Sequence, residues 1–393
     1  MGVVGIIAEF NPLHNGHVVH IEESKKISGC EKVIAVMSGN FVQRGEPAIF
    51  NKWQRTEAAL RCGVDVVLEL PVFYCLCGAD YFARGAVGIL ESTGVVSALS
   101  FGCECGDLEA VKRAAEVLLG EPGQYKEVLQ KKLSGGHSFA AARGQALEAC
   151  MYDSPDGLFT KPNNGLGMEY VKALKLLGSS MKIFATHRKS GGPSASRIRK
   201  SLFDGIVPEN EMPSEAVRLL FSCAETFTVS DLKQKPVKLD DFSDVFRFML
   251  YSGEKKLCFG EGLENRFRRL AGEHPKISDL LMAVKTKRYT HTRLQRTVLR
   301  AILGMDDTCG EPEYIRLLGF RQSAVKLVGD ISKKAKLPFI TSGRKMDDML
   351  KSNSTASKML AKELEAGDIY RLASGESGKY RHERGKGIVI FDD

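Results

Sequence analysis

The stretch "VVGIIAEFNPLHNGHVVH" (residues 3–20) joins a short apolar run to two histidines by way of a proline. The apolar run is typical of a buried strand, and the pattern predicts a helix from about Gly16 to Ser28. His14 and His17 therefore lie where a strand passes into the N-terminus of a helix. Because the first backbone N–H groups of a helix are unpaired and attract phosphate, the stretch predicts a phosphate-binding turn.

The two histidines suit chemistry at a phosphoanhydride. Imidazoles can donate hydrogen bonds to phosphate oxygens and balance the charge that develops when the bond breaks. Gly16 would let a nucleotide approach the backbone closely, and Pro12 would fix the path of the loop. The same spacing also suits an ordinary helix cap with two surface histidines, so the spacing alone leaves both interpretations open.

Strands and helices alternate through the first half of the chain. Strands are expected at residues 3–10, 32–37, 64–71, 96–102 and 181–188, and helices at 51–63, 79–94, 106–120 and 162–178. The strands are Val/Ile/Leu runs, as strands buried on both faces should be. This order predicts an α/β fold with a doubly wound, parallel, Rossmann-like sheet.

The character of the sequence changes near residue 205. Clear buried strands disappear, and helical patterns rich in Lys and Arg follow. We therefore expect two domains: residues 1–204 form the α/β domain that carries the predicted phosphate-binding turn, and residues 205–393 form a mainly α-helical, basic domain. A length of 393 residues is ample for both cores.

Composition limits the class of protein. The chain is 43% hydrophobic and 26% charged, with a formal net charge of +8, which permits a polyanionic partner without requiring one. Its apolar runs are too short to span a bilayer and no secretory segment opens the chain, so we expect a cytoplasmic protein with reduced thiols. The pairs Cys75/Cys77 and Cys103/Cys105 make a metal site conceivable, but buried thiols are the favoured interpretation and no metal ligand set is predicted.

Two further segments suit a nucleotide site. "SASRIRK" (194–200) lies at a helix start, and its hydroxyls with Arg197 and Arg199 could clamp the β- and γ-phosphates. "SGNFVQRGEP" (38–47) follows the second strand, at the carboxyl edge where ligands of such sheets bind. Its polar residues Gln43, Arg44 and Glu46 suit a binding loop better than a core.

These motifs carry a resemblance. The H-x-G-H turn with a late "SxSxIR" segment resembles the nucleotidylyltransferase superfamily. A longer series is similar to the bacterial tRNA(Met) cytidine acetate ligase family: "GIIAEFNPLHNGHVVH", "VIAVMSGNFVQRGEPAIFNKWQRTEAAL", "GVDVVLELP", "FARGAVGIL", "SFG", "PNNGLGMEY", "KRYTHTRLQR" and "YIRLLGF". The match covers most of the chain. It departs from the family in a shorter loop before the Ser-rich motif and in the C-x-C pairs.

The resemblance implies that residues 1–204 are a nucleotidyltransferase-like, ATP-binding catalytic domain and that residues 205–393 are a tRNA-binding domain. It also implies a reaction. Acetate and ATP would give acetyl-adenylate and pyrophosphate, and the acetyl group would pass to the wobble cytidine of elongator tRNA(Met), forming N4-acetylcytidine. Mg²⁺ is expected on the substrate phosphates rather than in a protein cage. The oligomeric state stays open.

The resemblance also implies site residues. His14, His17, Ser196 and Arg199 would be catalytic. The expected ATP-binding residues are Ile7, Ala8, Glu9, Phe10, Asn11, Pro12, Leu13, Asn15, Gly16, His20, Gly102, Asn163, Asn164 and Arg188. Judged from the residues alone, His20 lies one turn into the first helix, where packing or capping explains it.

The basic stretch "KTKRYTHTRLQRTVLR" (285–300) contains no acidic residue. Cations can follow RNA phosphates and an aromatic ring can stack on a base, whereas the alternative is a solvated helix face. The expected tRNA-binding residues are Lys285, Lys287, Arg288, Tyr289, Arg293 and Arg296.

Two other functions share some of these sequence features. A small-molecule adenylyltransferase of cofactor biosynthesis would share the H-x-G-H chemistry, but it would not need the basic second half. A non-enzymatic RNA-binding protein is disfavoured because the histidines, Ser196 and Arg199 are intact.

Overall fold

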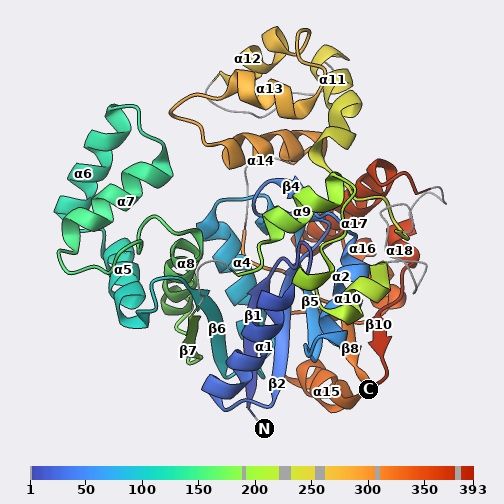
Figure 1. The fold of residues 1–393 in the computed structure, drawn as a ribbon. Helices are drawn as coiled ribbons and strands as arrows, with labels where there is room; N and C mark the ends of the chain where they lie inside the picture. The colour runs from blue at the N-terminus through green and yellow to red at the C-terminus, as the bar shows by residue number, and fades with distance from the viewer. Residues whose placement is uncertain (1, 188–191, 221–231, 253–261, 306–309, 377–381) are drawn as a thin grey trace.

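A mostly parallel sheet runs through the centre of the molecule, with helices on both faces (Figure 1). The computed structural model describes residues 2–187, 192–220, 232–252, 262–305, 310–376 and 382–393. The strand order is β10-β8-β5-β2-β1-β6-β7, and β9 pairs with β8. Their bounds are β1 Val3–Ala8, β2 Lys32–Ser38, β5 Val66–Leu70, β6 Ala98–Cys103, β7 Lys182–His187, β8 Ile315–Arg321, β9 Phe339–Ile340 and β10 Val389–Phe391.

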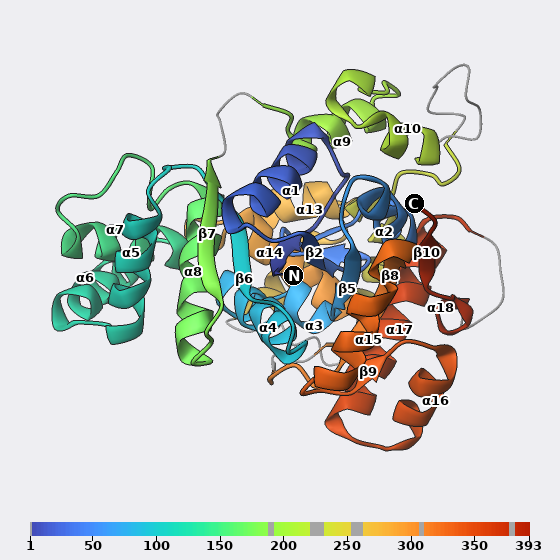
Figure 2. The same cartoon turned by 90° about the horizontal axis from the view of Figure 1, so that it is seen from below.

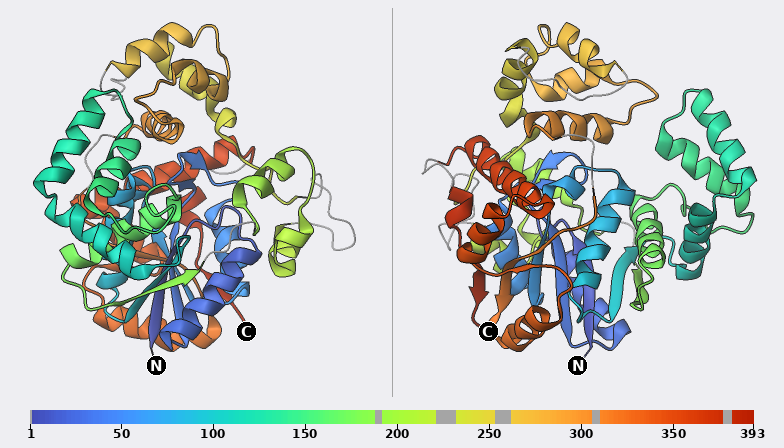
Figure 3. Two further views of the ribbon diagram at one scale, coloured as in Figure 1. Left: turned by 60° about the vertical axis from the view of Figure 1, so that its left-hand side comes forward. Right: turned by 180° about the vertical axis from the view of Figure 1, so that it is seen from behind.

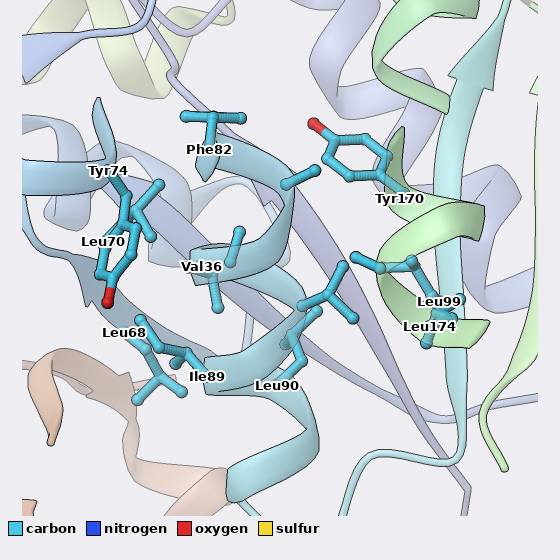
Figure 4. Packing of buried hydrophobic residues seen from close by; sticks show 14 of the residues in the cluster. Val36, Leu68, Leu70, Tyr74, Phe82, Ile89, Leu90, Leu99, Tyr170 and Leu174 are labelled. Carbon is cyan, nitrogen blue, oxygen red and sulfur yellow. The ribbon is translucent and has the colours of Figure 1, made fainter. Parts of the chain in front are cut away.

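Alternate side chains along each strand point to opposite faces of the sheet and pack into a separate hydrophobic core on each face. Val33 and Ala35 of β2 pack on the face covered by α1 (Asn15–Ser28) and α2 (Lys52–Arg61). Ile34 and Val36 point to the opposite face, which is covered by α4 (Ala79–Ser92) and α8 (Pro162–Leu176). Figure 4 shows this second core between Val36, Leu99 and the α4 side chains Phe82 and Leu90. Burial of both faces explains the unbroken apolar strands and confirms the predicted doubly wound architecture.

The C-terminal part of the chain returns to the sheet, which differs from the expectation that strands end before residue 205. Strand β8 pairs antiparallel with β5, and β10 pairs parallel with β8. Ile315, Leu317 and Leu318 of β8 are buried, so the strand completes the sheet core. The prediction of a separate helical domain over 205–393 is therefore wrong for residues 315–391, which extend the first domain's sheet.

Two groups of helices project from the body of the molecule, and the other helices pack around the sheet (Figures 1–3). A helical lobe contains α11 Ser243–Ser252, α12 Leu263–Leu270, α13 Ile277–Val284 and α14 His291–Ile302. Its buried core also includes Phe41, Val72 and Tyr370 from the rest of the molecule. A hairpin of α6 (Gly123–Ser134) and α7 (Phe139–Cys150) stands beyond α5 (Leu108–Gly120). The other helices are α3 Val72–Cys75, α9 Ala195–Phe203, α10 Ser214–Leu220, α15 Val325–Lys334, α16 Gly343–Lys351, α17 Thr355–Ala373 and α18 His382–Gly385.

Within the described segments, no helix combines the length and the apolar character that crossing a bilayer requires.

Candidate active site

The histidine turn lies at the point where the strand order reverses. From β1 the chain builds outward through β2 and β5, whereas β6 and β7 are added on the other side of β1. The carboxyl ends of β1 and β6 are therefore neighbours, and ligands of doubly wound sheets bind outside such a reversal. The residues after β1 carry the H-x-G-H turn, and the end of β6 carries Gly102. The fold thus brings together two segments that the sequence places far apart.

His14 and His17 face each other at the start of α1. His14 is the N-cap, and the two imidazoles stack with ring centroids 3.7 Å apart and an interplanar angle of 24°. The backbone N–H of His14 donates to Nδ1 of His17 at 3.2 Å. Because Nδ1 of His17 accepts this bond, a neutral His17 carries its proton on Nε2. The pair thus places two imidazoles at the positive end of the helix dipole, where phosphate is attracted.

Gly16 has a structural reason for being glycine, besides the close approach of a nucleotide that the sequence predicts. A Cβ at this position would lie 3.0 Å from Cε1 of His14, so a side chain would press on the histidine ring. The absent side chain therefore preserves the stacking of His14, which is 2% exposed. At Gly102, by contrast, a Cβ would have no heavy atom within 4 Å, so this glycine does border open space.

Arg199 connects the late Ser-rich segment to the histidine turn. Its Nη1 donates to the carbonyl oxygen of Asn11 at 2.9 Å, and its Nη2 pairs with Glu46 Oε2 at 2.9 Å. Ser196 lies one turn earlier in α9, with Oγ 3.5 Å from Arg199 Nη2. Arg197, which the sequence also offered as a clamp, instead forms a bidentate ion pair with Glu211.

Glu9 lies directly after β1 and holds the loop that follows β2. Its Oε1 accepts the backbone N–H of Gln43 at 2.6 Å, within a small hairpin formed by β3 (Phe41–Val42) and β4 (Glu46–Pro47). Burial raises the pKa of the Glu9 carboxyl, while the Gln43 hydrogen bond and the nearby Arg44 act in the opposite direction. The predicted binding loop therefore packs directly against the histidine turn.

Arg55 is an organising residue that sequence analysis missed. This buried guanidinium donates to the carbonyl oxygens of Glu9 at 2.7 Å and Ser38 at 3.1 Å, and also to that of Gly39. Burial lowers the pKa of Arg55 to about 10. It ties the loops after β1 and β2 together. Its place among the apolar positions of the predicted helix 51–63 is the signal in the sequence that points to burial.

The adjacent asparagines of "PNN" divide into two roles. Asn164 is 0% exposed, and its Oδ1 accepts the backbone N–H groups of Glu104 at 2.8 Å and Cys105 at 3.3 Å. Its Nδ2 donates to the carbonyl oxygen of Gly157 at 3.1 Å. Asn164 is thus occupied in shaping the loop after β6, which leaves the partly buried Asn163 as the amide able to meet a nucleotide.

Other expected nucleotide residues are spread around the turn. Ile7 and Ala8 are the last residues of β1. The loop between β1 and α1 contains four buried residues, Phe10, Asn11, Pro12 and Leu13. Nδ1 of His20 lies 2.7 Å from Thr186 Oγ1, so His20 connects α1 to the end of β7. The Asn15 side chain donates to the carbonyl oxygen of Asn210 at 3.0 Å. Arg188 lies outside the described residues.

The C-x-C thiols are packed within the protein. Cys75 Sγ donates to the carbonyl oxygen of Leu70, and burial raises the pKa of the Cys75 thiol. Cys103 and Cys105 have their sulfurs 3.3 Å apart, and burial raises the pKa of Cys103 to about 11. Among the described residues no group of three or more His, Cys, Asp or Glu side chains is arranged to hold a metal ion.

The basic stretch is partly internal. Tyr289 is 8% exposed in the core of the helical lobe, with the Arg293 guanidinium 5.0 Å from its ring centroid, so the expected stacking surface is covered here. Arg296 donates to the carbonyl oxygen of Gln43 at 2.9 Å, and this bond joins α14 to the loop at the active site. Lys285, Lys287 and Arg288 are exposed and stay candidates for contact with RNA.

Comparison with known proteins agrees with this geometry. The HIGH Nucleotidyl Transferase family matches residues 1–384. The chain is 39% identical to the tRNA(Met) cytidine acetate ligase of Thermoanaerobacter sp. (strain X514), covering 95% of this chain and 96% of the relative. It is 38% identical to the ligase of the same name from Acetivibrio thermocellus, with 94% of each chain covered.

A solved structure extends the likeness to three dimensions. The crystal structure of Thermotoga maritima TmcAL bound with alpha-thio ATP superimposes with a TM-score of 0.88 at 30% identity, covering 100% of both chains. The chain therefore belongs to the HIGH nucleotidyl transferase family, among the tRNA(Met) cytidine acetate ligases.

Proposed function

We propose that this protein is an ATP-dependent ligase that acetylates the wobble cytidine of elongator tRNA(Met). The stacked pair of His14 and His17 at the N-terminus of α1, outside the strand-order reversal, is the observation that carries the proposal. The names of the relatives supply the RNA substrate. The analogue bound to the Thermotoga protein supports ATP as the nucleotide.

The first step is activation of acetate. An acetate oxygen attacks the α-phosphorus, the bond from that phosphorus to the bridging oxygen breaks, and pyrophosphate leaves. Helix N–H groups and the imidazole of His17 stabilise the charge that grows on the phosphate oxygens. Arg199 and Ser196 border the same turn and would attract the leaving pyrophosphate. Arg188 is proposed for the nucleotide site on the family resemblance alone.

The second step transfers the acetyl group. The N4 amine of cytidine attacks the carbonyl carbon of acetyl-adenylate, the carbon–oxygen bond to AMP breaks, and the amine loses a proton. Both steps need mainly correct placement of reactants, which the fixed loops around Glu9 and Arg55 provide. Gly102, Asn163 and His20 are proposed for the adenosine end of ATP.

Mg²⁺ is proposed to arrive on the ATP phosphates. The carboxylates nearest the turn, Glu9 and Glu46, are engaged by Gln43 and Arg199, so they do not form an obvious cation cage. A divalent ion held by β- and γ-phosphate oxygens would neutralise the charge of the leaving group. The exposed cations Lys285, Lys287 and Arg288 are proposed to attract the tRNA backbone.

Transfer of label from acetate to RNA tests the function. The protein is incubated with ATP, Mg²⁺, radiolabelled acetate and transcripts of elongator tRNA(Met), either unchanged or with the wobble cytidine replaced by uridine. Label in the cytidine transcript alone is expected. Label in neither transcript, together with adenylyl transfer to a small molecule, would instead favour an adenylyltransferase of cofactor biosynthesis.

A further inference from the structure

We propose that the α6–α7 hairpin is an RNA-binding arm that contacts the tRNA through its basic, aromatic turn, "KKLSGGHSF" (131–139). The proposal rests on the proposed function, because it assigns a second contact for the same substrate. Neither the nucleotide chemistry nor the basic stretch of α14 explains why this turn has the composition it has.

The arm is anchored at the active site. Residues 106–161 leave the sheet after β6 and return at α8, and both ends are held by the site's own asparagines. Asn164 Oδ1 accepts the backbone N–H of Glu104, and the backbone N–H of Asn163 donates to Glu104 Oε2 at 3.2 Å. A displacement of the arm would therefore also displace the loop that borders the proposed adenosine site.

Packing makes the hairpin a firm extension rather than a loose loop. The Arg143 guanidinium of α7 pairs with the buried Glu169 carboxylate of α8. Gln124 Nε2 of α6 donates to the carbonyl oxygen of Ala149 at 2.8 Å. Tyr125 and Leu147 are buried between the helices. A rigid arm loses little conformational entropy when it binds, which favours its use as a contact surface.

The turn carries positive charge without acidic neighbours. No Asp or Glu occurs from residue 128 to residue 147, whereas Lys131, Lys132 and His137 lie within the turn itself. Both lysines lie in the last turn of α6. Nδ1 of His137 lies 3.2 Å from the carbonyl oxygen of Lys132. Such a local excess of cations matches the phosphate backbone of RNA. It disfavours a protein partner whose surface has few acidic residues.

An exposed aromatic ring accompanies these cations. Phe139, the last residue of the turn and the first of α7, is 56% exposed. A large apolar ring exposed to water near lysines is typical of surfaces on which unstacked bases stack. The wobble base lies in a single-stranded loop, so bases suited to stacking are present near the reacting cytidine.

The arm and the helical lobe rise on the same side of the molecule, beyond the end of the sheet where β1 and β6 terminate (Figures 1 and 3). A tRNA that brings its anticodon to the histidine turn would thus meet exposed cations of both elements. Helix α15 lies at the opposite end of the sheet and provides a control surface (Figure 1).

Four proteins test the arm: wild type, Lys131→Glu/Lys132→Glu, Phe139→Ala, and the control Lys326→Glu/Lys333→Glu on α15. Elongator tRNA(Met) affinity is measured across salt, alongside acetate-dependent exchange between ATP and pyrophosphate without RNA. The lysine variant should bind roughly tenfold more weakly, with a log–log salt slope shallower by about 2. Phe139→Ala should bind about fivefold or more weakly with an unchanged slope. The control should match wild type, and exchange should be equal in all four.

The outcomes separate this inference from the proposed function. A wild-type protein that does not acetylate tRNA would overturn the function itself. If the wild type acetylates tRNA and both arm variants bind it like the control, the arm is not an RNA contact, and a protein partner for this turn becomes the explanation. Melting temperatures establish that the variants are folded. Should charge reversal unfold the hairpin, Lys131→Ala/Lys132→Ala decides the outcome with Phe139→Ala.

Discussion

Arg296 of α14 donates a hydrogen bond to the carbonyl oxygen of Gln43, with the two atoms 2.9 Å apart. The backbone N–H of the same residue, Gln43, donates to Glu9 Oε1 at 2.6 Å, on the side of the histidine turn. Gly45, with φ of +80°, lies so close to α14 that a Cβ would meet the Arg296 nitrogen at 2.6 Å. The helical lobe is therefore fastened to the loop that supports the histidine turn.

This joint gives Arg296 a different role from the exposed cations of the same stretch. Arg296→Ala should slow acetate-dependent exchange between ATP and pyrophosphate by about tenfold or more, because displacing a positioning loop by an ångström can cost up to about 100-fold. Lys287→Ala is the matched variant, since Lys287 is exposed. It should leave exchange unchanged and make the salt slope of tRNA binding shallower by about 0.9. Equal exchange in both variants would contradict the joint.

The histidine pair should be needed for chemistry. Replacing His17 by Ala removes an imidazole donor at the helix start, and we expect exchange to fall by about 100- to 1,000-fold, or roughly 2.7–4 kcal/mol. His14→Ala should lose a similar amount and should also lower the melting temperature, because the buried His14 ring packs on His17 and Gly16. Exchange rates and thermal unfolding of both variants check this. Near-normal exchange in either variant would remove that histidine from the mechanism.

Much of the site could be predicted because it is local in sequence. A strand, a proline and a helix start determine where His14 and His17 lie relative to the backbone, and a buried apolar run identifies β1. The alternation of strands and helices predicts a parallel sheet with helices packed against it. These features depend on residues within about one element of each other, which periodicity and capping rules describe well.

The features that sequence analysis missed depend on partners far along the chain. Whether "YIRLLGF" is a strand depends on β5, which lies more than two hundred residues earlier and pairs with it antiparallel. The sequence around Tyr289 predicts a ring that is free to stack on a base, whereas in the structure this ring is buried in the core of the helical lobe. The family resemblance places Asn164 among the nucleotide-binding residues and gives Arg55 no role, whereas the partners of both side chains are backbone atoms of other loops. Local patterns do not specify such pairings.

The two asparagines of "PNN" should respond differently to substitution. Asn164→Ala would leave the backbone N–H groups of Glu104 and Cys105 without their acceptor, which should cost about 1–3 kcal/mol of stability. Asn163→Ala removes only a partly buried side chain, so the melting temperature should stay near wild type while the KM for ATP rises. Thermal unfolding and ATP titrations of the exchange reaction separate the two. A stable Asn164→Ala protein with raised KM would reverse the assignment.

A buried cluster of charges joins the sheet to α17 and should make stability depend on pH. The Lys52 ammonium lies 2.5 Å from Glu69 Oε1 and 3.5 Å from Glu363 Oε1, and Arg316 pairs with the second Glu69 oxygen at 2.8 Å. Glu363 Oε2 also accepts the backbone N–H of Val72 at 2.5 Å. Burial and the neighbouring Glu69 carboxylate raise the pKa of Glu363 to about 8.

The sign of the effect follows from proton binding. The Glu363 pKa is higher in the folded protein than in the unfolded chain, so the folded state holds the extra proton. The stabilisation is fully present below the ordinary glutamate pKa of about 4.3 and is lost as the pH rises toward about 8. The pKa of Glu69 is lowered to about 2, so this carboxyl contributes no change in the same window. Glu363→Gln imitates the protonated acid and should flatten the decline. Denaturant unfolding at pH 5, 6, 7 and 8 gives the comparison: parallel curves for the wild type and this variant would show that Glu363 is ionised throughout.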